Sequence, residues 1–134
     1  LFTDLKKLFP EEEFQFEAPS PELKLNADRT QIEQVLINLL KNAREACNRK
    51  LDKNIQVKVK KLSTGNTALT ISDNGEGILP DVLDKIFVPF FTTKTSGSGI
   101  GLSLCKQIMT LHEGSINVKS EVGKGSSFIL TFPK

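Results

Sequence analysis

Residues 70–78 read TISDNGEGI, a predicted strand that ends in an acidic residue before a glycine-rich loop. Asp73 is in phase with Leu69 and Ile71, so the alternation of a half-buried strand directs its carboxylate toward the buried side of the sheet. A carboxylate in that position requires a hydrogen-bond donor. Adenine presents an amine at N6 where guanine has a carbonyl oxygen, so a buried Asp73 would select adenine. A turn without a ligand is the alternative interpretation.

The segments around this loop predict an α+β fold. The predicted strands cover residues 14–18, 23–26, 55–59, 69–71, 115–119 and 126–132, and the predicted helices cover residues 28–48, 80–86 and 100–111. Antiparallel hairpins combined with long amphipathic helices indicate a two-layer α/β sandwich. We expect a mixed, mostly antiparallel sheet with about three helices packed on one face.

Amide side chains border the apolar face of the first long helix. The polar stripe comprises Gln31, Asn38, Asn42, Glu45 and Arg49. Asn38 and Asn42, four residues apart, could direct two neutral carbonyl oxygens at one spot, which suits Mg²⁺ because that ion takes hard oxygen ligands together with waters and substrate phosphates. A polar helix flank bonded to neighbouring loops is the alternative.

Glycines stand at two places where backbone could approach a ligand. Gly75 and Gly77 would admit a flat ligand that a Cβ would obstruct. Residues 97–102 read GSGIGL just before the last predicted helix, and this pattern fits neither the Rossmann nor the Walker fingerprint, because residue 102 is leucine. Backbone N–H groups at a helix start can still bind an anion, and a lid hinge is a compatible alternative.

Composition narrows the functional classes. The chain has 134 residues, 18 Lys and Arg against 16 Asp and Glu, and a net charge of +2, too mixed to favour nucleic-acid capture. It has no long apolar stretch and no signal-peptide pattern, so we expect a soluble, cytoplasmic domain without membrane contact. Cys47 and Cys105 fit no metal or redox spacing and are expected to be buried, reduced thiols. The start at Leu1 suggests a fragment of a longer protein.

Four motifs in this order carry a family resemblance. They are Asn38-Leu39-Leu40-Lys41-Asn42-Ala43, Asp73-Asn74-Gly75-Glu76-Gly77-Ile78, Phe87-Val88-Pro89-Phe90-Phe91-Thr92-Thr93-Lys94 and Gly97-Ser98-Gly99-Ile100-Gly101-Leu102. They resemble the N, G1, F and G2 boxes of the ATP-binding catalytic domain of sensor histidine kinases in two-component systems, nearest to the nitrogen-regulator class. The resemblance covers residues 28–133. It implies the left-handed βαβ (Bergerat) ATP-binding fold shared with gyrase, heat-shock chaperone ATPases and mismatch-repair ATPases.

The resemblance also implies roles for individual residues, with ATP and Mg²⁺ as cofactors. Asp73 would receive the adenine amine. The remaining cofactor-binding residues would be Gly75, Gly77 and Ile78 at the base, Gly97, Gly99, Gly101 and Leu102 at the phosphates, and Ser126 in the adenine hydrogen-bond network. Asn42 would coordinate Mg²⁺ with Asn38 beside it.

This chain departs from the family pattern at Thr92 and differs from ATP-hydrolysing relatives of the superfold at Asn38. Many relatives have an arginine where Thr92 stands, so we assign contact with the γ-phosphate to Lys94. ATP-hydrolysing relatives have a glutamate where Asn38 stands, and an amide cannot take a proton from water, which favours a kinase over an ATPase. His112, the single histidine, ends a helix before Gly114 and lacks the surroundings of a phosphoacceptor, so we expect a structural role for it.

We therefore expect residues 13–134 to be the ATP-binding catalytic domain and residues 1–12 to be the remnant of a connection to an upstream dimerisation and phosphoacceptor domain. The domain would transfer the γ-phosphate of ATP to a histidine on that upstream domain. Expected partners are the upstream domain, a response regulator and, for the parent protein, a second copy; membrane anchoring of the parent is left open. The alternatives are a serine-protein kinase or ATPase of the same superfold, and a catalytically silent nucleotide-binding module.

Overall fold

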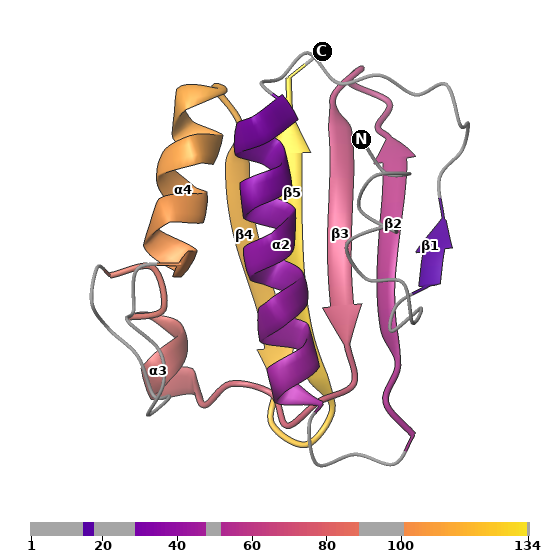
Figure 1. Cartoon of the computed structure of the whole chain (residues 1–134), viewed down its shortest axis with the longest axis vertical. Coiled ribbons are helices and arrows are strands. Elements are labelled where there is room, and N and C mark those ends of the chain that lie inside the picture. Colours follow the sequence, from indigo (N-terminus) through magenta and orange to yellow (C-terminus); the bar gives the residue numbers. More distant parts are fainter. Residues whose placement is uncertain (1–14, 18–28, 48–51, 89–100, 134) are drawn as a thin grey trace.

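A computed structural model describes residues 15–17, 29–47, 52–88 and 101–133. This part of the chain contains five strands and three helices (Figure 1). Their order is β1 (Gln15–Glu17), α2 (Arg29–Ala46), β2 (Ile55–Lys61), β3 (Thr67–Asp73), α3 (Pro80–Leu83), α4 (Gly101–Leu111), β4 (Ser115–Glu121) and β5 (Gly125–Phe132).

The strands form one sheet in the order β1-β2-β3-β5-β4. β1 and β2 are parallel with α2 between them in sequence, and every other pair is antiparallel. The β2–β3 hairpin sets Val57 opposite Ile71, as the alternation predicts. The prediction of a mixed, mostly antiparallel sheet is confirmed.

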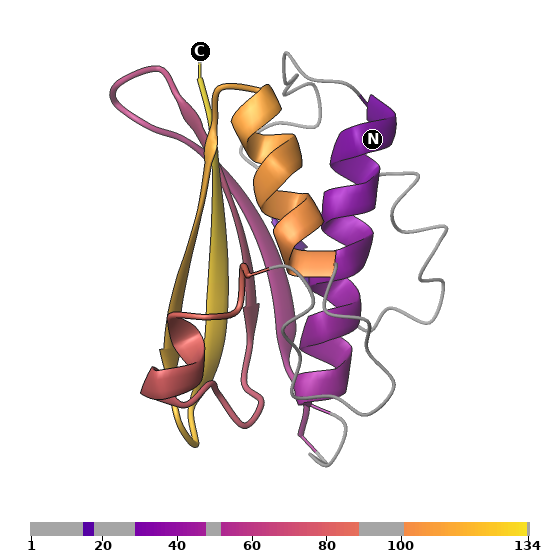
Figure 2. The same ribbon diagram turned by 90° about the vertical axis from the view of Figure 1, so that its left-hand side faces the viewer.

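The helices α2 and α4 cover one face of the sheet and leave the other face open (Figure 2). Apolar residues recur along α2 at the spacing of one helix face, and every second residue of β2, β3 and β5 points toward them. The largest fully buried side chains include Ile32, Leu36, Leu39, Leu69, Ile71, Met109 and Leu130. The short α3 lies near the β4 edge of the sheet (Figure 1), and its Val82 and Leu83 pack against this core.

The ends of the helices depend on local hydrogen bonds. α4 stops where Gly114 N–H donates to the Met109 carbonyl at 2.9 Å and His112 Nδ1 donates to the Ile108 carbonyl at 2.8 Å, which gives His112 a structural role as expected. The residue with left-handed backbone at this helix end is Glu113 (φ 59°), and Gly114 does not have a positive φ. Gly114 is required for a different reason, because a Cβ there would collide with the Thr131 carbonyl.

Several predicted boundaries shift. α3 ends at Leu83, three residues before the predicted end, and residues 84–87 continue as turns. β4 and β5 extend to the turn at residues 122–124. The predicted strand at 23–26, the predicted helix start at residue 28 and the connection at 1–12 lie outside the described residues. None of the helices in the described part is long and apolar enough to cross a membrane.

Truncation of a core leucine in α2 should destabilise the fold strongly. Leu36 has no exposed surface, so Leu36→Ala removes buried methyl groups and leaves a cavity. We expect a loss of about 2–5 kcal/mol in the free energy of unfolding, measured by urea denaturation. Leu111→Ala is the matched control, because that leucine is 73% exposed, and it should change stability by less than about 0.5 kcal/mol. Equal losses in the two variants would contradict this description of the core.

Candidate functional site

Asp73 is the last residue of β3, and its side chain lies on the side of the sheet covered by the helices. Its charge acts on the thiol of Cys47, which follows the end of α2, and raises the pKa of that thiol in addition to the larger effect of burial. Asp73 Oδ1 accepts a hydrogen bond from Gly75 N–H at 2.9 Å. The predicted orientation of this carboxylate toward the buried side is therefore confirmed.

Burial raises the pKa of Asp73 above its ordinary value. The backbone N–H groups of Gly75 and Ser126 act in the opposite direction, but their effect is smaller. The surroundings of Asp73 therefore disfavour the charged carboxylate. A ligand that donates a hydrogen bond to it would supply what the surroundings lack.

Residues 74–78, here called the glycine loop, are fixed by bonds to three other parts of the chain. Glu76 N–H donates to the Ala46 carbonyl at the end of α2 (3.3 Å), and the Glu76 carbonyl accepts from Gly123 in the β4–β5 turn (2.9 Å). The Asn74 side chain holds the approach to β2, because Oδ1 accepts from Asn54 N–H at 2.8 Å and Nδ2 donates to the Asp52 carbonyl at 2.9 Å. The loop is thus a fixed wall of the site.

The two glycines of this loop are required by close packing within the protein. A Cβ on Gly75 would lie 2.5 Å from the Ala46 carbonyl oxygen, and a Cβ on Gly77 would collide with the Glu121 carbonyl. Gly77 also has φ of 79°, where side chains are strained. The sequence predicted room for a flat ligand, whereas the structure gives these glycines a structural reason of their own.

Asp73, Ser126 and Ser120 occupy one row across β3, β5 and β4. Asp73 is paired with Ser126, and Ser126 with Ser120. The Ser120 and Ser126 hydroxyls are 2.9 Å apart, and Ser120 Oγ also accepts from Ile78 N–H at 2.8 Å. Sequence reasoning missed Ser120. The sequence did indicate where this side chain lies, because Ser120 is in phase with Ile116 and Val118 along the strand. This alternation places it on the helix side of β4.

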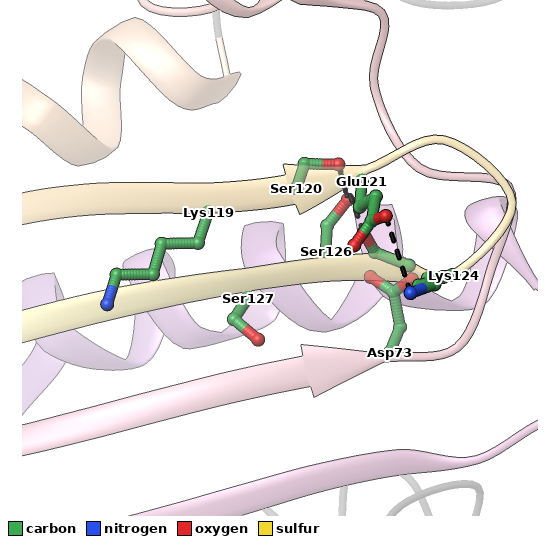
Figure 3. Close-up of a pocket in the computed structure, with 8 residues that line it drawn as sticks. Asp73, Lys119, Ser120, Glu121, Lys124, Ser126 and Ser127 are labelled. Carbon is green, nitrogen blue, oxygen red and sulfur yellow. Dashed lines mark hydrogen bonds and ion pairs between the residues drawn. The ribbon is translucent and has the colours of Figure 1, made fainter.

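A shallow hollow lies beside this row at the end of the sheet (Figure 3). Its lining comprises Asp73, Lys119, Ser120, Glu121, Lys124, Gly125, Ser126 and Ser127. Ser127 is hydrogen-bonded to Ser72 at 3.0 Å, and both alternate away from the helices. The hollow therefore extends around the strand ends and does not represent the predicted nucleotide site, which also involves residues 89–100 outside the described part of the chain.

The amides of α2 lie toward the first turn of α4. A Cβ built on Gly101 would be 3.7 Å from Oδ1 of Asn38. Asn38 also hydrogen-bonds the thiol of Cys105, although burial dominates and raises the pKa of that thiol to about 11. Asn42 lies one turn further along the same helix and is half-buried. Both cysteines are buried and free, as predicted.

The remaining predicted site residues divide into two groups. Leu102, in the first turn of α4, packs against the core and is half-buried. Lys94, Gly97, Gly99 and Arg49 lie outside the described residues, so their roles stay predictions. Of the third motif, Phe87 and Val88 are described, and the centroid of the Phe87 ring lies 5.6 Å from the ammonium of Lys106.

The sequence that forms this half-buried carboxylate, the glycine loop and the two helices matches the model of a known family. The model for "Histidine kinase-, DNA gyrase B-, and HSP90-like ATPase" covers residues 27–134. The chain belongs to this ATPase family. Sensor histidine kinase ZraS of Salmonella typhimurium is 42% identical over 110 residues, which are 82% of this chain and 23% of that protein.

Solved structures extend the likeness to nearly the whole chain. The nucleotide-free catalytic domain of histidine kinase ThkA has a TM-score of 0.84 and 36% identity, covering 98% of this chain and 89% of that one. A structure of ThkA in complex with the response regulator TrrA has a TM-score of 0.80 and 34% identity, covering 99% of this chain and 39% of that one. The expected α+β fold of histidine kinase catalytic domains is confirmed. This chain spans about a quarter or less of the curated relatives it matches.

Asp73→Asn should not destabilise the nucleotide-free domain at neutral pH. A raised carboxyl pKa means that the folded state binds more protons than the unfolded state. The protonated carboxyl therefore contributes to stability at pH values below its ordinary pKa. This contribution is lost as the pH rises through the pKa of the folded state. The neutral amide has no such dependence. In thermal scans at pH 7, we expect the variant to unfold at the same temperature as the unaltered chain or at a higher one. The difference in unfolding temperature should shrink toward pH 3.5. A much lower unfolding temperature of the variant at pH 7 would contradict the direction of the pKa shift.

Proposed function

We propose that this chain binds Mg·ATP and transfers the γ-phosphate to a histidine on a separate dimerisation domain of a two-component sensor kinase. The half-buried carboxylate of Asp73 beside the fixed glycine loop carries the proposal, because it offers a hydrogen-bond acceptor that could receive the adenine amine. Membership in the family and similarity to ThkA and ZraS support the histidine kinase reaction over the other activities of the superfold.

The base would lie against Asp73, Gly75, Gly77 and Ile78, with Ser126 completing its hydrogen bonds. The fixed position of the glycine loop supports this base site, because the loop is hydrogen-bonded to α2 and to the β4–β5 turn within the protein itself. A preformed site loses less conformational freedom on binding than a site that must order itself. The phosphates would be held by Gly97, Gly99, Gly101 and Leu102, with Lys94 at the γ-phosphate.

Magnesium would be held by Asn42, with Asn38 beside it. The donor set fits this ion, since amide oxygens are hard ligands and Mg²⁺ keeps waters and phosphate oxygens as its remaining ligands. In the described part of the chain no group of three or more His, Cys, Asp or Glu residues could hold a metal ion. A magnesium ion here would therefore take most of its ligands from the nucleotide and water, and would neutralise charge on the phosphates.

Asn38 favours phosphoryl transfer over hydrolysis. Its amide cannot accept a proton from water, and its Oδ1 lies near Gly101 at the start of α4. Transfer to a neutral imidazole needs positioning and charge neutralisation more than a base. The domain would act on a histidine of its own upstream domain in a homodimeric, cytoplasmic kinase region, and a response regulator would take the phosphate, as the ThkA–TrrA complex suggests by analogy.

ATP binding should depend on the Asp73 charge. In isothermal titration calorimetry with Mg²⁺, Asp73→Asn should weaken ATP binding by about a hundredfold or more, because a site built to pair with an amine rejects a mismatched partner strongly. The control is Asp84→Asn, an exposed aspartate at the end of α3, which should bind ATP normally. Unchanged affinity in Asp73→Asn would rule out this base site.

The phosphorylated product should carry phosphohistidine. In the longer protein that includes the upstream helical region, ATP labelled at the γ position should yield an acid-labile, base-stable phosphoryl group. Asn42→Ala in the same protein should lower the labelling at least about tenfold through weaker Mg²⁺ binding. Acid-stable phosphoserine would instead support a serine kinase, and release of phosphate without labelling would support an ATPase.

A further inference from the structure

We propose that Ser120 is a positioning residue that sets the base specificity of this site by fixing the direction of the Ser126 hydroxyl proton. The inference rests on the proposed function, because it concerns the base of the bound nucleotide. Ser120 lies on β4 and carries none of the roles assigned above. Its contacts nevertheless connect the glycine loop to the row that contains Asp73.

Ser120 Oγ has three hydrogen-bonding neighbours. It accepts from Ile78 N–H at 2.8 Å, it donates to the Gly125 carbonyl at 3.0 Å, and it lies 2.9 Å from Ser126 Oγ. A backbone N–H can only donate and a carbonyl can only accept. Two of the three contacts therefore have a fixed direction.

The third direction follows from counting protons. A serine hydroxyl has one proton and two lone pairs. The Ser120 proton goes to the Gly125 carbonyl, so the contact with Ser126 is a hydrogen bond only if Ser126 donates. The single proton of Ser126 is then committed to Ser120. Toward the site, Ser126 retains only acceptor capacity.

This commitment has a consequence for the base. Ser126 is the cross-strand partner of Asp73, and an ionised carboxylate is also an acceptor only. The row therefore presents acceptors, which suit the N6 amine of adenine and oppose a carbonyl oxygen at the same position. Without Ser120, the Ser126 hydroxyl could rotate and donate to such a carbonyl. Ser120 thus acts on specificity through Ser126.

The test compares ATP with inosine triphosphate, whose base has a carbonyl in place of the amine. Dissociation constants with Mg²⁺ give a discrimination ratio for each variant of this chain. Ser120→Ala should lower the ratio about tenfold, within the range expected for one mismatched buried polar group. Ser120→Thr keeps the hydroxyl and should preserve the ratio. Ser127→Ala is the matched control, because that hydroxyl pairs with Ser72 on the open face of the sheet.

A second comparison separates positioning from general damage. In a Ser126→Ala background, adding Ser120→Ala should leave the ratio unchanged, because Ser120 would have no hydroxyl left to orient. If Ser120→Ala does not fold, Ser120→Cys replaces it, since a thiol is a weak acceptor of similar size. Equal weakening of both nucleotides, or an unchanged ratio with normal ATP binding, would overturn the inference alone. Failure of the unaltered chain to bind ATP would overturn the proposed function as well.

Discussion

A partly desolvated negative charge at the end of a central strand organises the site. The Asp73 carboxylate receives one hydrogen bond from the glycine loop, and that loop is held in turn by α2 and the β4–β5 turn. These bonds keep the wall rigid, but they do not compensate fully for burial, because the pKa of Asp73 remains raised. The domain therefore holds a hydrogen-bond acceptor at a fixed position whose charged form is disfavoured by burial. Such tension between stability and function is common at binding sites.

Sequence periodicity was sufficient to predict the long helices, the central strands and the orientation of Asp73, but not the order of the strands in the sheet. The apolar spacing of α2 and the alternation of β2 and β3 each report directly on which face is buried. The role of Ser120 could not be predicted, because it depends on the register between β4 and β5, which pairs it with Ser126. The sequence also could not show why residue 75 must be glycine, because the reason is its close packing against Ala46, which is distant in sequence.

The helix layer contributes a second set of constraints. Asn38 lies between the first turn of α4 and the Cys105 thiol, so a polar side chain at the helix border is oriented by the neighbouring helix. This explains why an amide stripe read from sequence alone supported two interpretations. Asn38 makes a contact inside the protein, and Asn42 one turn further on remains the proposed magnesium ligand.

The position of β5 has a consequence for biosynthesis. It is the last described strand along the chain, yet it lies between β3 and β4 and supplies Ser126 to the Asp73 row. On the ribosome, β2 and β3 can pair early as a hairpin, but the row cannot close until β5 has left the exit tunnel. The row of Asp73, Ser126 and Ser120 would therefore be complete only in the step that completes the sheet.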